Sequence, residues 1–170
     1  LYSQTYSPLE VVVVDSNSTD GTPDAVRQLY PQTTVIRASD NHYWAGATNI
    51  GVRFALNHGC DFVFTVNDDS VICPNHIERL VEIACSHKLS ILGNRIDYMS
   101  NPGLVWSLGT SSSWESAGFI SLNYHQAEFE KIPENISLKE FGQVDALAGN
   151  GVLIHRDVYE KIGLYNTLFT

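Results

Sequence analysis

The chain has few cysteines, few basic residues and no long hydrophobic run. Its three cysteines, Cys60, Cys73 and Cys85, are an odd number without CxxC spacing, so we expect buried free thiols and neither a disulfide framework nor a zinc site. Lys and Arg number 10 against 19 Asp and Glu, a formal net charge of −9. Because proteins that track nucleic-acid phosphates are normally basic, we expect no nucleic-acid partner.

Membrane spans and two common enzyme motifs are also missing. No stretch reaches the apolar length of a membrane span, and no basic-then-apolar signal opens the chain, so we expect a cytoplasmic protein. Neither the phosphate-loop pattern GxxxxGK[ST] nor the hydrolase pattern GxSxG occurs. Hydrophobic residues still make up 44% of the 170 residues, which predicts one folded domain with a core.

The first half of the chain alternates apolar strand patterns with amphipathic helix patterns. The predicted strands are 11–14, 33–36 and 62–66, and the predicted helices begin at Thr22-Pro23, cover 47–57 and open at Pro74. Because Phe and Val dominate 62–66 without polar alternation, we expect that strand to be buried on both faces. Three strand–helix units in succession predict a mostly parallel sheet flanked by helices.

The pattern changes after about residue 90. Short strand candidates at 90–92, 104–108 and 117–121 are separated by Gly, Ser and Asn, and 126–142 is charged and loop-like. Apolar character returns at 144–154, and a short helix is predicted over 156–162. The second half therefore predicts a small antiparallel portion.

Two adjacent carboxylates follow the strand predicted at 62–66. The segment Asn67-Asp68-Asp69-Ser70 stands at the carboxyl end of that strand, where open α/β sheets bind ligands. Neighbouring carboxylates repel each other, and a divalent cation shared with a phosphorylated ligand would supply the counter-charge. The alternative is a plain strand-to-turn exit, since Asn, Asp and Ser all favour turns.

Four segments in order resemble the motifs of one enzyme family. Residues 12–22 (VVVDSNSTDGT) resemble the signature VVDNxSxDGT, and 41–51 (NHYWAGATNIG) resemble N-x-G-[FW]-A-G-[AG]-x-N-x-G, with Tyr43 where a Gly is common. Residues 67–70 match NDD-[ST], a variant of the DxD metal motif, and 148–164 resemble G-x-x-x-L-I-x-R…G-x-[FY]. The chain is thus similar to family 2 glycosyltransferases of the GT-A fold, and within them to the rhamnosyltransferase-like bacterial members.

The resemblance implies a fold, an activity and partners. The fold would be a GT-A-type, Rossmann-like α/β domain with a mixed, mostly parallel sheet flanked by helices and a small antiparallel portion in the second half. Residues 1–90 would form the nucleotide-binding half and 91–170 the acceptor and sugar-side half of a single domain. The enzyme would transfer a sugar, with inversion, from a nucleoside-diphosphate-sugar donor to a carbohydrate or lipid-linked glycan acceptor in cell-surface polysaccharide synthesis.

The resemblance also implies roles for single residues. Asp69, with Asp68, would hold Mg²⁺ or Mn²⁺, and Asp15 would accept a hydrogen bond from the nucleobase imide. For Asp15 the alternative is a turn-forming residue at a strand exit, and for the glycines at 149–151 it is a bulge in a strand. The residues expected to bind the nucleotide sugar are Asp15, Asn17, Asn41, Gly46, Asn49, Asp68 and Gly149.

Family members usually carry a further strand before the first motif and a catalytic base, the Asp of a Glu-Asp motif, after the last. We therefore expect a fragment at both ends that binds donor more readily than it turns it over, with the base beyond residue 170. Peripheral membrane association would come through segments outside these residues. Two rival functions stay open: a nucleotide-sugar nucleotidylyltransferase, whose Gly-rich and Arg-containing loop is not seen in this sequence, and a non-catalytic nucleotide-sugar-binding module.

Overall fold

The computed structural model describes residues 1–39, 42–101, 104–114, 120–124, 130–131 and 142–169. The chain divides into two compact units, which are described separately. The first comprises residues 1–64, 70–91 and 153–170, and the second comprises 65–69 and 92–152. The chain passes between the units after residues 64, 69, 91 and 152. The predicted roles of residues 1–90 and 91–170 stay predictions.

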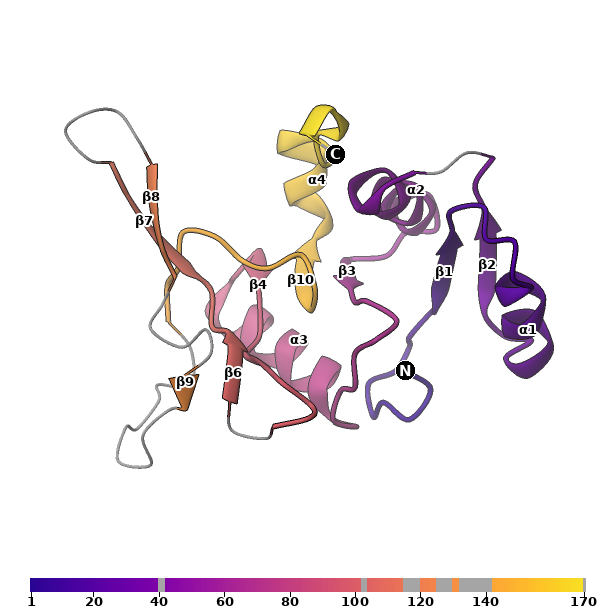
Figure 1. Ribbon diagram of the computed structural model, residues 1–170, viewed down its shortest axis with the longest axis horizontal. Coiled ribbons are helices and arrows are strands. Elements are labelled where there is room, and N and C mark those ends of the chain that lie inside the picture. Colours follow the sequence, from indigo (N-terminus) through magenta and orange to yellow (C-terminus); the bar gives the residue numbers. More distant parts are fainter. Residues whose placement is uncertain (40–41, 102–103, 115–119, 125–129, 132–141, 170) are drawn as a thin grey trace. The chain divides into compact units, whose positions relative to one another are not determined.

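The first unit opens with a parallel strand pair. Strand β1 (Val12–Asp15) pairs with β2 (Thr34–Arg37) in parallel, in a register that sets Asp15 opposite Arg37. Helix α1 (Thr22–Leu29) connects the two strands and packs beside β2 (Figure 1). All three elements were predicted. Gly21, at φ +85°, provides the left-handed turn that precedes the helix.

Helix α2 (Trp44–Asn57) packs against β1 (Figure 1) and starts three residues before the predicted 47–57. Its first bond runs from the Ala47 N–H to the Tyr43 carbonyl at 3.0 Å. A Cβ atom on Gly51 would lie 3.3 Å from Val14 Cγ2, and Val52 on the same helix is 1% exposed. The small residue therefore allows the helix to approach the strand closely.

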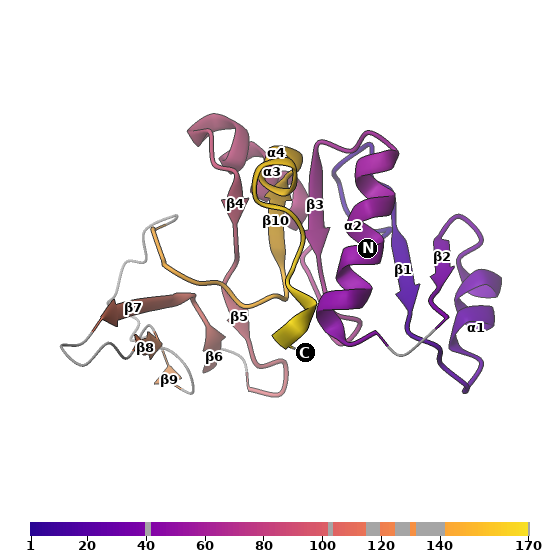
Figure 2. The ribbon, with the colours of Figure 1, turned by 90° about the horizontal axis from the view of Figure 1, so that it is seen from above.

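Strand β10 (Val152–His155) lies between β3 (Phe62–Thr65) and β4 (Ile91–Leu92) (Figure 2). The Gly151 N–H donates to the Thr65 carbonyl at 2.7 Å and the Arg156 N–H to the Asp61 carbonyl at 2.8 Å, so β3 and β10 run antiparallel. The prediction that β3 is buried on both faces was wrong. Its residues are all half-buried because, among the described residues, β3 has a strand neighbour on one side only. The core strand is β10, in which Val152, Leu153 and Ile154 are buried.

Two further helices complete the first unit. Helix α3 (His76–His87) begins two residues after Pro74 and buries Ile77, Leu80 and Ala84, the face that the sequence predicted. Helix α4 (Arg156–Ile162) matches its predicted bounds and is followed by a short 3₁₀ turn, η1 (Thr167–Phe169). Within the described ranges, no helix combines the length and apolar character needed to cross a membrane.

The N-terminal end of α3 is capped from far away in the sequence. The Ile77 N–H donates to Gln4 Oε1 at 3.0 Å, and Gln4 Nε2 donates to the Cys73 carbonyl at 2.7 Å. The Thr5 N–H donates to the Pro74 carbonyl at 2.8 Å. Residues 4 and 5 therefore satisfy backbone groups that the helix and its entry leave open.

The second unit holds the antiparallel portion that the sequence predicted. Strands β5 (Ile96–Asp97), β6 (Leu104–Ser107) and β9 (Glu130–Lys131) form one sheet, and β7 (Thr110–Trp114) pairs with β8 (Ile120–Tyr124). All these pairings are antiparallel, and Val105 on β6 is fully buried. The Ser-rich β7 was not predicted. Most of the predicted loop 126–142, and 117–119 of the predicted strand 117–121, lie outside the described residues.

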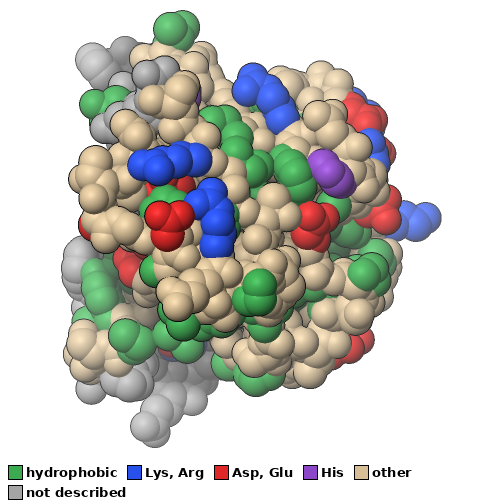
Figure 3. All heavy atoms as spheres, turned by 90° about the vertical axis from the view of Figure 1, so that its right-hand side faces the viewer, with side chains coloured by type: hydrophobic (Ala, Val, Ile, Leu, Met, Phe, Trp, Pro, Cys, Tyr) green, Lys and Arg blue, Asp and Glu red, His purple; other side chains and the backbone are tan. Residues whose placement is uncertain are grey.

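Two surface features bear on the expectations from composition. Cys60, Cys73 and Cys85 are all free thiols, as predicted, but Cys73 and Cys85 are exposed, so the expectation of burial was wrong for these two. Figure 3 views the side on which α1 and β2 lie in Figure 1, and acidic and basic side chains are interspersed over it. On this face, the excess of acidic residues does not produce a patch of one sign.

Replacing Gln4 by Ala should lower the free energy of unfolding by about 1 kcal/mol, the usual effect of losing a helix cap. The reason is that the Ile77 N–H would lose its acceptor. Urea unfolding followed by circular dichroism measures the change. Gln28→Ala, at an exposed position on α1, is the matched control and should stay within about 0.5 kcal/mol of the wild type. Equal stability of the two variants would contradict the capping role.

Candidate functional site

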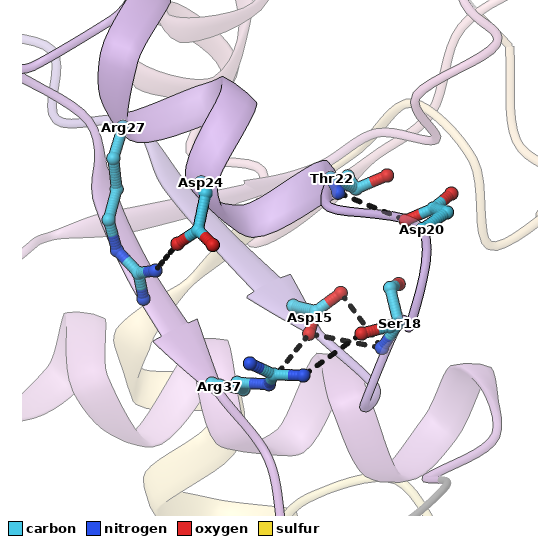
Figure 4. Close-up of polar contacts among 7 residues, drawn as sticks. All are labelled: Asp15, Ser18, Asp20, Thr22, Asp24, Arg27 and Arg37. Atoms are coloured by element: carbon cyan, nitrogen blue, oxygen red, sulfur yellow. Dashed lines mark hydrogen bonds and ion pairs between the residues drawn. The ribbon is translucent and has the colours of Figure 1, made fainter.

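Asp15 is a buried carboxylate at the end of β1. Its residue is 5% exposed, and its two carboxylate oxygens accept the Ser18 N–H at 3.3 and 3.2 Å (Figure 4). Its own carbonyl accepts the Ala38 N–H at 2.9 Å. Asp15 therefore forms the turn that the sequence offered as the alternative reading. One backbone donor leaves an ionised carboxylate with further acceptor capacity for a ligand N–H.

Arg37, at the end of β2, lies beside the same turn. Its Nε is 3.7 Å from Asp15 Oδ2, and its Nη2 donates to the Ser18 carbonyl at 3.0 Å (Figure 4). The Asp15 side chain is 3% exposed, whereas that of Arg37 is 50% exposed. The guanidinium thus supplies a counter-charge for a carboxylate that is almost removed from water.

Three further predicted site residues are Asn17 in this loop, Asn41, and Gly46 in α2. Asn17 is exposed and has φ +65°, a left-handed conformation that Asn tolerates better than most residues. Ser16 Oγ donates to the His42 carbonyl at 2.7 Å, and a Cβ on Gly46 would lie 3.1 Å from His42 Cβ. A side chain at position 46 would therefore require His42 to shift by a few tenths of an ångström. Asn41 lies outside the described residues.

Asp20 and Thr22 order the turn into α1. The Thr22 N–H donates to Asp20 Oδ1 at 3.0 Å (Figure 4). Hydrogen bonds from the Thr22 side chain and backbone lower the pKa of Asp20. Asp20 is exposed, so its local role is to stabilise this turn.

Asn49 is hydrogen-bonded through its side chain to the backbone of Tyr165. It is 4% exposed on α2, its Nδ2 donates to the Tyr165 carbonyl at 2.8 Å, and its Oδ1 accepts the Tyr165 N–H at 2.9 Å. Trp44 packs edge-on against the Tyr165 ring, with centroids 5.2 Å apart. The Asn49 amide therefore holds the segment after α4 against α2. Its predicted contact with a nucleotide sugar stays a prediction.

In the second unit, Asp68 and Asp69 stand on an exposed turn directly after β3. Three bonds tie the start of this turn to residues 149–151. Thr65 Oγ1 donates to the Gly149 carbonyl at 3.0 Å, the Asn67 N–H donates to Asn150 Oδ1 at 2.9 Å, and the Gly151 N–H donates to the Thr65 carbonyl at 2.7 Å. The glycine segment thus anchors the carboxylate turn.

Gly151 itself is required by its surroundings. It has φ +75°, and a Cβ there would collide with the side chain of Asn94. The Gly149 carbonyl accepts the hydrogen bond of the Thr65 hydroxyl, and the predicted contact of Gly149 with the nucleotide sugar stays a prediction. The shape of this corner therefore depends on the backbone of residues 149–151.

Asp68 and Asp69 offer two adjacent carboxylates, and the expected metal site stays a prediction. Among the described residues, no three His, Cys, Asp or Glu side chains gather where they could hold a metal ion. A cation at Asp68 and Asp69 would need further oxygens from water or phosphate, and this coordination suits Mg²⁺ and Mn²⁺. In the first unit, burial and the charge of Glu10 raise the pKa of the partly buried Cys60 thiol, which disfavours its reactive thiolate form.

Four side chains around these sites were not singled out from the sequence: Arg37, Thr65, Asn150 and Tyr165. One signal was available for Arg37, which directly follows the predicted strand 33–36 and in the structure ends β2 at the sheet edge that Asp15 shares. Asn67 and Asn150 are 83 residues apart, and Asn49 and Tyr165 are 116 residues apart. No local pattern indicates such pairs, because tertiary folding alone brings them together.

Replacing Asn49 by Ala should lower the free energy of unfolding by about 2 kcal/mol, since the half-buried N–H and carbonyl of Tyr165 would both lose their partner. Thermal and urea unfolding measure this loss. Asn57→Ala, at an exposed position of the same helix, should change the stability by less than about 0.5 kcal/mol. If Asn49→Ala were as stable as Asn57→Ala, the Asn49 amide would not have this structural role.

Comparisons with known proteins identify the family. The family model described as glycosyl transferase family 2 matches residues 1–163. The low-salt glycan biosynthesis hexosyltransferase Agl10 of Haloferax volcanii is 29% identical over 99% of this chain and 52% of its own length. An uncharacterized glycosyltransferase of Nostoc sp. is 30% identical over 76% of this chain and 46% of its own. The chain thus spans about half the length of these relatives. The matched region carries the Asp15 turn, the Asp68-Asp69 turn and the glycine segment that anchors it, and the chain belongs to glycosyl transferase family 2.

Proposed function

We propose that the protein transfers a sugar, with inversion, from a nucleoside-diphosphate-sugar donor to a carbohydrate or lipid-linked glycan acceptor. The match to the family model over residues 1–163 is the observation that supports this function most. The relative from Haloferax is described as a hexosyltransferase of glycan biosynthesis, which favours a hexose donor and a glycan acceptor. The same matches favour glycosyl transfer over nucleotidyl transfer.

The described residues support a division of roles. Asp15 would accept an N–H of the nucleobase, because it is a buried carboxylate with acceptor capacity to spare. Asp69, with Asp68, would hold Mg²⁺ or Mn²⁺, because both side chains are exposed and carry only oxygen donors. When bound, the cation would offset the charge that develops on the departing diphosphate.

Several parts of this proposal reach beyond the 170 residues. Deprotonation of the acceptor hydroxyl requires a general base, which we propose lies beyond residue 170. A rhamnose donor, a bacterial origin, a place in cell-surface polysaccharide synthesis and a cytoplasmic location, with peripheral membrane association, remain part of the proposal. They follow from the resemblance of the motifs.

Binding of UDP, dTDP and GDP to the full-length gene product, measured by calorimetry with and without Mn²⁺, tests the donor site. At least one nucleotide should bind, and Mn²⁺ should strengthen its binding about tenfold or more, since Asp68 and Asp69 would hold the cation and its charge would favour the diphosphate. Binding of none of the three would count against glycosyl transfer from these donors. Pyrophosphate release from a sugar phosphate and a nucleoside triphosphate would instead indicate a nucleotidylyltransferase.

Replacing Asp69 by Asn should remove most of the Mn²⁺-dependent gain in nucleotide affinity and abolish transfer, because a neutral amide is a poor ligand for a hard cation. Asp61→Asn is the matched control, since Asp61 is also exposed and stands at the other end of β3. It should bind as the wild type does. Unchanged binding and unchanged Mn²⁺ dependence in Asp69→Asn would point to a non-catalytic module.

The Asn150 side chain should support cation binding at Asp68 and Asp69 indirectly, because it accepts the Asn67 N–H at the start of their turn. Asn150→Ala removes the acceptor that anchors the turn and should weaken Mn²⁺-dependent binding about three- to tenfold, whereas Asn150→Asp keeps an oxygen acceptor and should bind more tightly than Asn150→Ala. The same calorimetry measures both. Equal affinities for the two variants would show that the anchoring bond does not support the turn.

A further inference from the structure

We infer that Arg37 is a positioning residue for nucleobase recognition and acts through Asp15. The inference rests on the proposed function, in which Asp15 binds the base. Arg37 was not marked by any motif, and it reaches the site from the neighbouring strand. Its role would be to fix the Asp15 carboxylate and the turn that follows it in the geometry that a base requires.

The register of the sheet explains why Arg37 is there. β1 and β2 pair in parallel from Val12 and Thr34 to Asp15 and Arg37, so the two side chains end the two strands at the same edge. The Ala38 N–H donates to the Asp15 carbonyl at 2.9 Å, which extends the ladder by one bond beyond this pair. The backbone therefore holds the two residues side by side, and the pairing does not depend on a mobile loop.

The guanidinium contacts both parts of the turn. Nε lies 3.7 Å from Asp15 Oδ2, while Nη2 donates to the Ser18 carbonyl at 3.0 Å (Figure 4). The Ser18 N–H in turn donates to both Asp15 oxygens. Arg37, Asp15 and Ser18 thus form a closed set of contacts, in which the planar guanidinium with its separate N–H groups spans carboxylate and carbonyl.

This arrangement restricts what the carboxylate can do. The Ser18 N–H is shared between both oxygens, and the positive charge stands against Oδ2, so Oδ1 is the atom less engaged and better placed for an incoming N–H. A directed acceptor discriminates among bases, because a base without a donor at that position leaves a buried carboxylate unpaired. Loss of Arg37 should therefore reduce base selectivity more than general nucleotide affinity.

A second arginine provides a matched control. Arg27 on α1 also forms an ion pair with an aspartate, Arg27 Nη1 lying 3.0 Å from Asp24 Oδ1 (Figure 4). This pair is exposed, and it lies within α1, apart from the hydrogen bonds of the Asp15 turn. Arg27→Gln and Arg37→Gln thus remove the same charge from one ion pair each, and only the second touches Asp15.

The experiment measures dissociation constants of UDP, dTDP, CDP and GDP with Mn²⁺ by calorimetry for wild type, Arg37→Gln, Arg37→Lys and Arg27→Gln, using the full-length gene product. Arg37→Gln should weaken the preferred nucleotide about tenfold and the others less, so that the preference among bases falls. Arg37→Lys keeps the charge but lacks the two separate donor nitrogens and should fall between Arg37→Gln and the wild type. Arg27→Gln should match the wild type. Melting temperatures establish that each variant is folded.

The outcomes separate this inference from the proposed function. If the wild type binds none of the nucleotides, the proposed function fails, and the role of Arg37 fails with it. If the wild type binds but Arg37→Gln weakens all four nucleotides by the same factor, Arg37 acts on the diphosphate or on the fold, and the inference is overturned. It is also overturned if Arg37→Gln or Arg37→Lys binds with wild-type affinity and preference.

Discussion

Backbone N–H groups at the ends of strands and at the starts of helices need acceptors, and in this chain side chains supply them. An N–H that leaves a ladder or begins a helix has no partner in its own element, and leaving it unpaired in the interior costs about 1–3 kcal/mol. Three such pairs recur through the two units: Ser18 N–H with Asp15, Asn67 N–H with Asn150 and Ile77 N–H with Gln4. A fourth pair, Tyr165 N–H with Asn49, holds the segment between α4 and η1.

Several polar residues at the proposed ligand sites therefore also form hydrogen bonds that stabilise the local backbone. Asp15 shapes its turn and would also read a base, and the turn that carries Asp68 and Asp69 is held by bonds made by its neighbours Thr65 and Asn67. The carboxylates themselves stay exposed. Holding a site through the backbone and neighbouring side chains leaves its reactive oxygens available, which is the general requirement for a preorganised site.

The sequence predicted the elements of the first unit well because their apolar periodicity is local. β1, α1, β2 and α4 were predicted to within about one residue, and α2 missed only its first turn. Two expectations failed for one reason. The burial of β3 and of Cys73 and Cys85 depends on which neighbours cover them, and composition carries no information on that point. The Ser-rich β7 was missed because its pairing with β8, not its own residue types, makes it a strand.

The sequence by itself determined the family, the α/β class and the positions of the two carboxylate turns. Motifs and apolar periodicity are local features, so short segments reveal them without tertiary context. Only the tertiary structure decided what stands beside those turns. The strand register places Arg37 beside Asp15, and Asn150 bonds the Asn67 N–H across 83 residues. The Asn49 side chain is hydrogen-bonded to the Tyr165 backbone. Hydrogen-bond partners so far apart are selected by folding, since the whole chain must satisfy its buried polar groups at once.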